Sequence, residues 1–175
     1  MTKPTIDRIW YVYALAAAAI LVTGGVVQAS DEDAFIVTIK SDNGFCLDVS
    51  RHSQEQGANI IVYRCHGKDN QKFELRSSGR GRNADWFSAE SVDSGLCLDI
   101  KGTSRARGTQ LIQWECKNSD NQRFDFRPSS DRGNIGEIRV KHSDLCLDAG
   151  DDKAGTKVTQ ASCTGSAQQQ WTVRR

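Results

Sequence analysis

The sequence has no excess of charge of either sign: 23 lysine and arginine residues stand against 22 aspartate and glutamate residues, and the formal net charge is +1. Proteins that bind nucleic acid usually carry a basic face, so this balance gives no support for such a partner. Methionine occurs once, and after residue 29 no segment shows the 3.6-residue apolar period of an amphipathic helix. Fifteen glycines in a chain without helical periodicity indicate a loop-rich β protein.

Motifs of common enzymes are missing as well. There is no Gly-rich phosphate loop and no G-x-S-x-G nucleophile elbow. His52, His66 and His142 belong to no nucleophile–base pattern, so we expect all three to be surface residues. The pair Asp151-Asp152 lacks the alternating ligands of a calcium loop. We therefore expect no catalytic residue, no metal site, no cofactor and no enzymatic activity.

One long apolar run, residues 9–27, follows a short basic start that includes Lys3 and Arg8. The small residues before Ser30 resemble the cleavage site of a secretory signal peptide, so we predict a signal peptide at residues 1–29. An uncleaved membrane anchor is the alternative, because the run of 19 residues (9 to 27) approaches spanning length. Either interpretation places the remaining chain outside the cytoplasm, secreted or periplasmic.

The rest of the sequence contains one pattern three times. Its middle copy reads Gly-Leu-Cys-Leu-Asp at 95–99, Leu-Ile-Gln-Trp-Glu-Cys at 111–116 and Asp-Asn-Gln-Arg-Phe at 120–124. The first cysteines of the copies are 51 residues apart (46 to 97) and then 49 residues apart (97 to 146). A fixed period of this kind predicts units that bury a core only by packing against one another.

Four β-rich stretches separated by turn residues recur in each copy. In the middle copy they lie around residues 86–91, 96–100, 110–115 and 122–127. We therefore expect one domain over residues 30–175, with repeats at about residues 34–81, 82–131 and 132–175.

The six cysteines occupy matched places in the three repeats. They form the pairs Cys46/Cys65, Cys97/Cys116 and Cys146/Cys163. A disulfide inside each repeat recurs three times by symmetry, and each closes a loop of about 20 residues, worth roughly 3 kcal/mol. A zinc knuckle needs a C-x2-4-C pattern that these spacings lack, and free buried thiols are the remaining alternative. Disulfides agree with a location outside the cytoplasm.

Each repeat ends on glutamine, any residue and an aromatic residue. The three copies are Gln71-Lys72-Phe73, Gln122-Arg123-Phe124 and Gln169-Gln170-Trp171. With this signature in register three times, the chain from about residue 34 to residue 175 resembles the ricin B-type lectin family. The resemblance implies an all-β fold, a β-trefoil with pseudo-threefold symmetry, twelve short strands and one disulfide per repeat.

The resemblance also implies which residues build the core. In this family the aromatic residue of the signature is buried, and the glutamine is largely a hydrogen-bonding strut. We expect the core to include Phe73, Phe124, Trp171, Leu47, Leu98, Leu147, Ile60, Val62, Leu111 and Val158.

The family binds sugars through an aspartate and an asparagine that bind hydroxyl groups and an aromatic ring that stacks on the sugar's C–H face. Carried over to matching positions, these roles fall on Asp48, Tyr63 and Asn70 in the first repeat and on Asp99, Trp114 and Asn121 in the second, with the neighbouring Gln71 and Gln122. The third repeat keeps Asp148 but has Ala161 and Gln168 at the other two positions, so we expect a degenerate site. The aspartates as turn-capping residues and the aromatics as half-buried edge residues are the structural alternatives.

The resemblance implies a non-catalytic lectin whose partners are glycans, galactose-like or related. Ile61 and Ile112 stand where some relatives have a polar residue, which leaves the sugar open. The alternative is a secreted interaction protein on the same scaffold, such as a protease inhibitor or a toxin targeting subunit with a partner chain, because fold does not decide function. Membrane association is expected only if the N-terminal segment is uncleaved.

Overall fold

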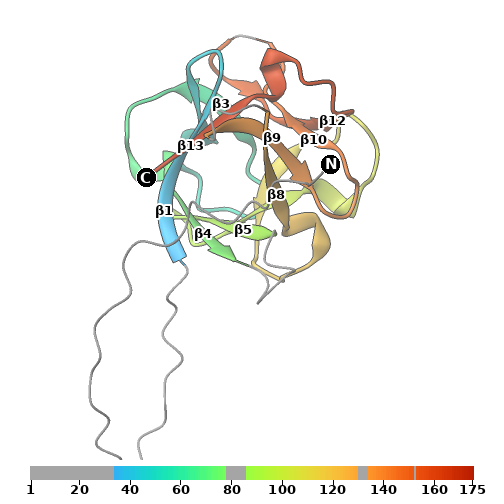
Figure 1. Ribbon diagram of the computed structural model, residues 1–175. Helices are drawn as coiled ribbons and strands as arrows, with labels where there is room; N and C mark the ends of the chain where they lie inside the picture. Colours follow the sequence, from blue (N-terminus) through green and yellow to red (C-terminus); the bar gives the residue numbers. More distant parts are fainter. Residues whose placement is uncertain (1–33, 78–85, 130–133, 152) are drawn as a thin grey trace, which may run out of the picture. The chain divides into compact units, whose positions relative to one another are not determined.

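The computed structural model describes residues 34–77, 86–129, 134–151 and 153–175 (Figure 1). The signal peptide or anchor predicted at residues 1–29 lies outside the described residues, as do parts of the two links between repeats and Asp152. None of the helices formed by the described residues is long and apolar enough to cross a membrane.

The described residues form strands joined by turns and single-turn 3₁₀ segments, without an α-helix. The strands of the first repeat are β1 (Ala34–Ser41), β2 (Phe45–Val49), β3 (Ile60–Arg64) and β4 (Phe73–Ser77). Those of the second are β5 (Phe87–Ser91), β6 (Cys97–Ile100), β7 (Leu111–Trp114) and β8 (Phe124–Pro128). Those of the third are β9 (Ile135–Val140), β10 (Cys146–Asp148), β11 (Thr156–Lys157), β12 (Thr159–Ala161) and β13 (Trp171–Arg174). The four strands expected in the middle repeat are confirmed to within two residues at each end, and the two-residue β11 is an addition in the third repeat.

The first and last strands of the three repeats close into a six-stranded barrel. Pairing runs from β1 to β4, β5, β8, β9, β13 and back to β1, every pair antiparallel. Figure 1 shows these strands around the centre of the domain. The inner strands of each repeat form a hairpin outside this ring: β2 with β3, β6 with β7, and β10 with β12. This arrangement is the β-trefoil expected from the sequence.

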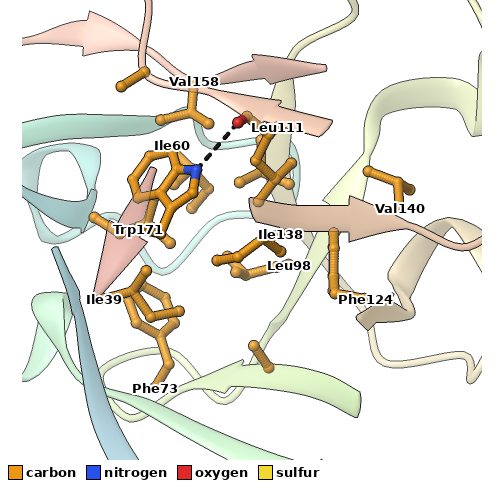
Figure 2. Close-up of a cluster of buried hydrophobic side chains, with 14 of the residues drawn as sticks. Ile39, Ile60, Phe73, Leu98, Leu111, Phe124, Ile138, Val140, Val158 and Trp171 are labelled. Carbon is orange, nitrogen blue, oxygen red and sulfur yellow. Dashed lines mark hydrogen bonds between the residues drawn. The ribbon is translucent and has the colours of Figure 1, made fainter. Parts of the chain in front are cut away.

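Alternation along the barrel strands explains which side chains enter the core. In β1, Val37, Ile39 and Ser41 are buried while Ile36 faces outward, the two-residue period of a strand with one solvated face. Figure 2 shows Phe73, Phe124 and Trp171 among the buried hydrophobic side chains of the core.

All ten predicted core residues are buried. The indole Nε1 of Trp171 donates a hydrogen bond to the backbone oxygen of Leu147 at 3.1 Å, so the one polar atom of this ring is satisfied in the core (Figure 2). The three predicted disulfides, Cys46–Cys65, Cys97–Cys116 and Cys146–Cys163, are also present.

A loop of each repeat packs on β3, β7 or β12 of another repeat, in a cyclic order. The amide of Gly57 donates to the oxygen of Gln113, that of Gly108 to the oxygen of Gln160, and that of Gly155 to the oxygen of Val62, each at 2.8 Å. Every repeat therefore receives a loop from a neighbour, next to Tyr63, Trp114 or Ala161.

Candidate functional site

Two of the candidate aspartates lie on the second strand of their repeat, and each accepts a hydrogen bond from the glutamine of the repeat's Gln-x-aromatic signature. In the first repeat, Gln71 Nε2 donates to Asp48 Oδ2 at 2.8 Å and to the oxygen of Arg64 at 2.9 Å. In the second, Gln122 Nε2 donates to Asp99 Oδ2 and to the oxygen of Glu115, both at 2.8 Å. Both glutamines are fully buried. The geometry therefore gives them a positioning role behind the site rather than a place on its surface.

Burial also sets the electrostatics of the two aspartates. Asp48 is 3% exposed and Asp99 is 6% exposed. Desolvation raises the pKa of both carboxyl groups above the ordinary value of 3.8, and the hydrogen bonds from their glutamines oppose part of that rise. Each carboxylate is thus fixed in direction and poorly hydrated, which suits an acceptor for ligand hydroxyl groups.

The second repeat brings its whole predicted set together. Asp99, Trp114 and Asn121 line one cavity of about 440 Å³. Asn121 Nδ2 donates to Asp99 Oδ2 at 2.9 Å and to the oxygen of Ile100 at 3.2 Å, so carboxylate and amide form one rigid unit. Trp114 is 37% exposed and offers part of its ring to this cavity.

The loop of the first repeat completes that cavity. Gly57 lines it, at a φ of +83° that disfavours residues with a side chain, and a Cβ there would lie 3.5 Å from Cζ3 of Trp114. Gln113, next to Trp114, fixes the same loop by donating from Nε2 to the oxygens of Ser53 and Glu55 at 2.8 and 2.9 Å. The ring is therefore supported from another repeat, which spacing within one repeat did not reveal.

The first repeat places the same three residue types with one difference. Tyr63 is 42% exposed and lies opposite Cys46, as Trp114 lies opposite Cys97. Asn70 is buried and donates from Nδ2 to the oxygen of Val49 at 3.1 Å, while its Oδ1 has no hydrogen-bond partner among the described residues.

His66 lies at the candidate site of the first repeat, and the sequence analysis did not predict it. Its Nε2 lies 3.4 Å from Asp48 Oδ2, and its ring centroid lies 6.3 Å from that of Tyr63 and 6.1 Å from that of His52. The signal available in the sequence was its position directly after Cys65, where the second repeat has Lys117, a residue that lines the cavity there.

The expectation that all three histidines are surface residues is wrong for His142. His52 and His66 are exposed, but His142 is 8% exposed and its Nε2 lies 2.9 Å from the backbone oxygen of Ser104. The loop of the second repeat that packs on the third repeat covers it, a contact between repeats that the sequence pattern does not show.

The third repeat uses its aspartate differently. Asp148 Oδ1 accepts from the amide of Gly150 at 2.7 Å, and Oδ2 accepts from Gln169 Nε2 at 3.0 Å. Both oxygens are thus hydrogen-bonded inside the repeat, and Ala161 lies opposite Cys146 where the other repeats have a ring. This geometry agrees with a structural role for Asp148.

Two family models together span residues 26–175 of this chain. A family model described as a ricin-type beta-trefoil lectin domain matches residues 85–175, and one described as a ricin-type beta-trefoil lectin domain-like family matches residues 26–114. The chain belongs to the ricin-type β-trefoil lectin family. Membership supports a carbohydrate-binding role.

Individual relatives agree with this assignment. A seed lectin of Trichosanthes anguina is 25% identical over 172 residues, which cover 96% of this chain and 30% of that protein. The designed threefold-symmetric protein ThreeFoil superimposes with a TM-score of 0.74 at 27% identity, covering 80% of this chain and 98% of ThreeFoil. The ricin B-like lectin of Macrolepiota procera, solved with lactose, gives 0.65 at 25% identity and covers 85% and 99%. The chain thus spans less than a third of the seed lectin's length but nearly all of the two single-trefoil structures.

Proposed function

We propose that this protein is a non-catalytic lectin with one sugar site in the first repeat and one in the second, the third being degenerate. The observation that carries this proposal is the cavity in which Asp99, Trp114 and Asn121 meet. A buried carboxylate and an amide accept and donate hydrogen bonds to sugar hydroxyl groups in fixed directions, and the exposed ring packs on the apolar C–H face. Asp48, Tyr63 and Asn70 do the same in the first repeat.

Each site is open and uses few polar groups, so we expect weak binding by a single site. An affinity around millimolar corresponds to about −4 kcal/mol. Two sites on one rigid domain raise the apparent affinity for a surface dense in glycans, because the second contact forms at a high effective concentration. Glycans of galactose-like or related configuration are the proposed partners, and the relative solved with lactose supports that choice.

Removing the rings tests the proposal directly. Trp114→Ala and Tyr63→Ala should each weaken binding to a glycan array, and the double variant should abolish it, while the folded state persists because both rings are partly exposed. Ala161→Trp serves as a matched variant in the repeat where no binding is expected, and it should leave binding unchanged. A wild-type protein that binds no glycan on the array but inhibits a protease from a panel would replace the lectin by an interaction protein.

We further propose that the domain acts outside the cytoplasm, secreted or periplasmic, after removal of residues 1–29. Three disulfides support an oxidising compartment. N-terminal sequencing of the exported protein should begin at Ser30, whereas a start at residue 1 or 2 would favour the anchor.

A further inference from the structure

Basic side chains accompany both complete sites. In the second repeat, Lys101 and Lys117 line the same cavity as Asp99 and Trp114. Lys101 comes from the loop that follows the aspartate strand, and Lys117 is the residue directly after the second cysteine, Cys116. The cavity is therefore lined by a buried acceptor and by two exposed lysines, here called its basic rim.

The first repeat also has basic residues in the loop after its aspartate and directly after its second cysteine, although Lys101 itself aligns with Ser50. The loop after Asp48 contains Arg51 and His52, and the residue directly after Cys65 is His66. His66 lies beside both Asp48 and Tyr63, and His52 stacks on His66, so these rings border the site.

The third repeat provides an internal comparison. The residue directly after Cys163 is Thr164, whereas the loop after Asp148 still contains Lys153. The repeat without the stacking ring therefore lacks the basic residue that follows the second cysteine in the other two. If that basic residue served the fold alone, the third repeat would need it as well.

Backbone conformation in the loop of the first repeat points the same way. Arg51 and His52 adopt φ values of 60° and 52°, in the left-handed region that side chains disfavour. The second repeat places Gly102 at the equivalent of Arg51, with a φ of 63°, so glycine serves this turn without strain. The first repeat thus keeps a strained arginine where glycine suffices, and strain of this kind is concentrated at functional sites.

We propose that both sites select saccharides that carry an anionic group, a carboxylate or a sulfate ester, next to the ring that stacks on Tyr63 or Trp114. This inference rests on the proposed lectin function and names the class of sugar. The ring hydroxyls face Asp48 or Asp99, and the anion faces the basic rim. Acidic neighbours reduce the rim charge: Glu115 Oε2 lies 3.5 Å from Nζ of Lys117, whose side chain is 54% exposed, and Asp93 Oδ2 lies 3.4 Å from His52 Nδ1.

An ammonium group about 4 Å from an anion in a well-hydrated setting strengthens binding about fivefold, and salt screens this gain. The test is an array of glycan pairs that differ only in one sulfate or one carboxylate, probed with the full chain at low and at physiological salt. The charged member of a pair should bind at least about fivefold more tightly at low salt, with a smaller difference at higher salt. Pairs with sulfate and pairs with carboxylate tell which anion is preferred.

Variants assign the effect to the rim of the second repeat. In a Tyr63→Ala background, which leaves only the site of the second repeat, Lys101→Gln/Lys117→Gln should remove the preference, so that the charged and the neutral member of a pair bind alike. Lys40→Gln/Arg174→Gln changes the net charge equally on β1 and β13, neither of which lines the cavity, and should keep the preference.

Each result decides a separate point. If charged and neutral glycans bind alike, the anion inference is wrong while the lectin function stands. If the Lys40/Arg174 control loses the preference as fully as the rim variant, the effect comes from net charge and the inference is wrong. If no glycan of either kind binds, the proposed function fails, and the anion inference fails with it.

Discussion

Replacing the aspartates of the second and third repeats by asparagine should have opposite consequences, because their hydrogen bonds differ. In Asp99 one oxygen, Oδ2, accepts from both Asn121 and Gln122. An asparagine can place its oxygen there and turn its amide nitrogen toward the ligand. In Asp148 the two oxygens accept from different donors, the amide of Gly150 and Gln169 Nε2, so an asparagine must direct its nitrogen at a donor.

The magnitudes follow from these contacts. For Asp99→Asn the stability should be unchanged or slightly higher, since burial disfavours the ionised carboxyl group and raises its pKa. A hydrogen bond to a charged group contributes about 1.5–3 kcal/mol, so glycan binding by the second site should weaken by about 10- to 150-fold. For Asp148→Asn a donor facing a donor should cost about 1–3 kcal/mol, a fall in Tm of roughly 3–12 °C, with glycan binding retained.

Calorimetric titration of glycan into each variant and thermal unfolding by circular dichroism measure the two quantities on the same samples. A Tyr63→Ala background removes the first site, so that the binding signal reports the second. The reasoning is refuted if Asp99→Asn binds glycan as well as its parent, or if Asp148→Asn loses binding without losing stability.

Three more predictions concern pH, packing and the disulfides. Because the pKa of Asp48 and of Asp99 is raised on folding, glycan binding should be lost on acidification at a pH above the ordinary carboxyl value of 3.8. The stability that these two groups contribute is present at low pH and is lost as pH rises through their folded pKa. Glycan binding and circular dichroism, each followed over pH, should show the two transitions separately. Gly136→Ala should destabilise the fold by at least about 1–3 kcal/mol, because a Cβ there overlaps the backbone of β8, and chemical unfolding measures it. Cys97→Ala/Cys116→Ala should lower the free energy of unfolding by about 2–5 kcal/mol in the same assay, because the variant loses the disulfide of the second repeat.

Much of the fold was predictable because one repeat explains the others. The signature residues Phe73, Phe124 and Trp171 recur in register, so their shared burial followed from the pattern, as did one disulfide per repeat. The exposure of Tyr63 and Trp114 also agrees with their expected role.

The contacts between repeats could not be predicted from the repeat pattern. The covering of His142 by the loop at Ser104 and the support of Trp114 by Gly57 join residues from different repeats, and periodicity carries no information about such pairs. The contact of His66 with Asp48 could not be predicted for another reason. No other repeat has a histidine at this position, so a comparison of the repeats does not single it out.

The closed ring of strands has a consequence for how the protein is made. β1 pairs with β4 in its own repeat and with β13 in the third, so the seam closes only once Trp171–Arg174 are present. A chain that leaves the ribosome with its amino end first therefore remains open through most of its synthesis. Placement of that final strand is therefore the last step that the shared core of the three repeats requires.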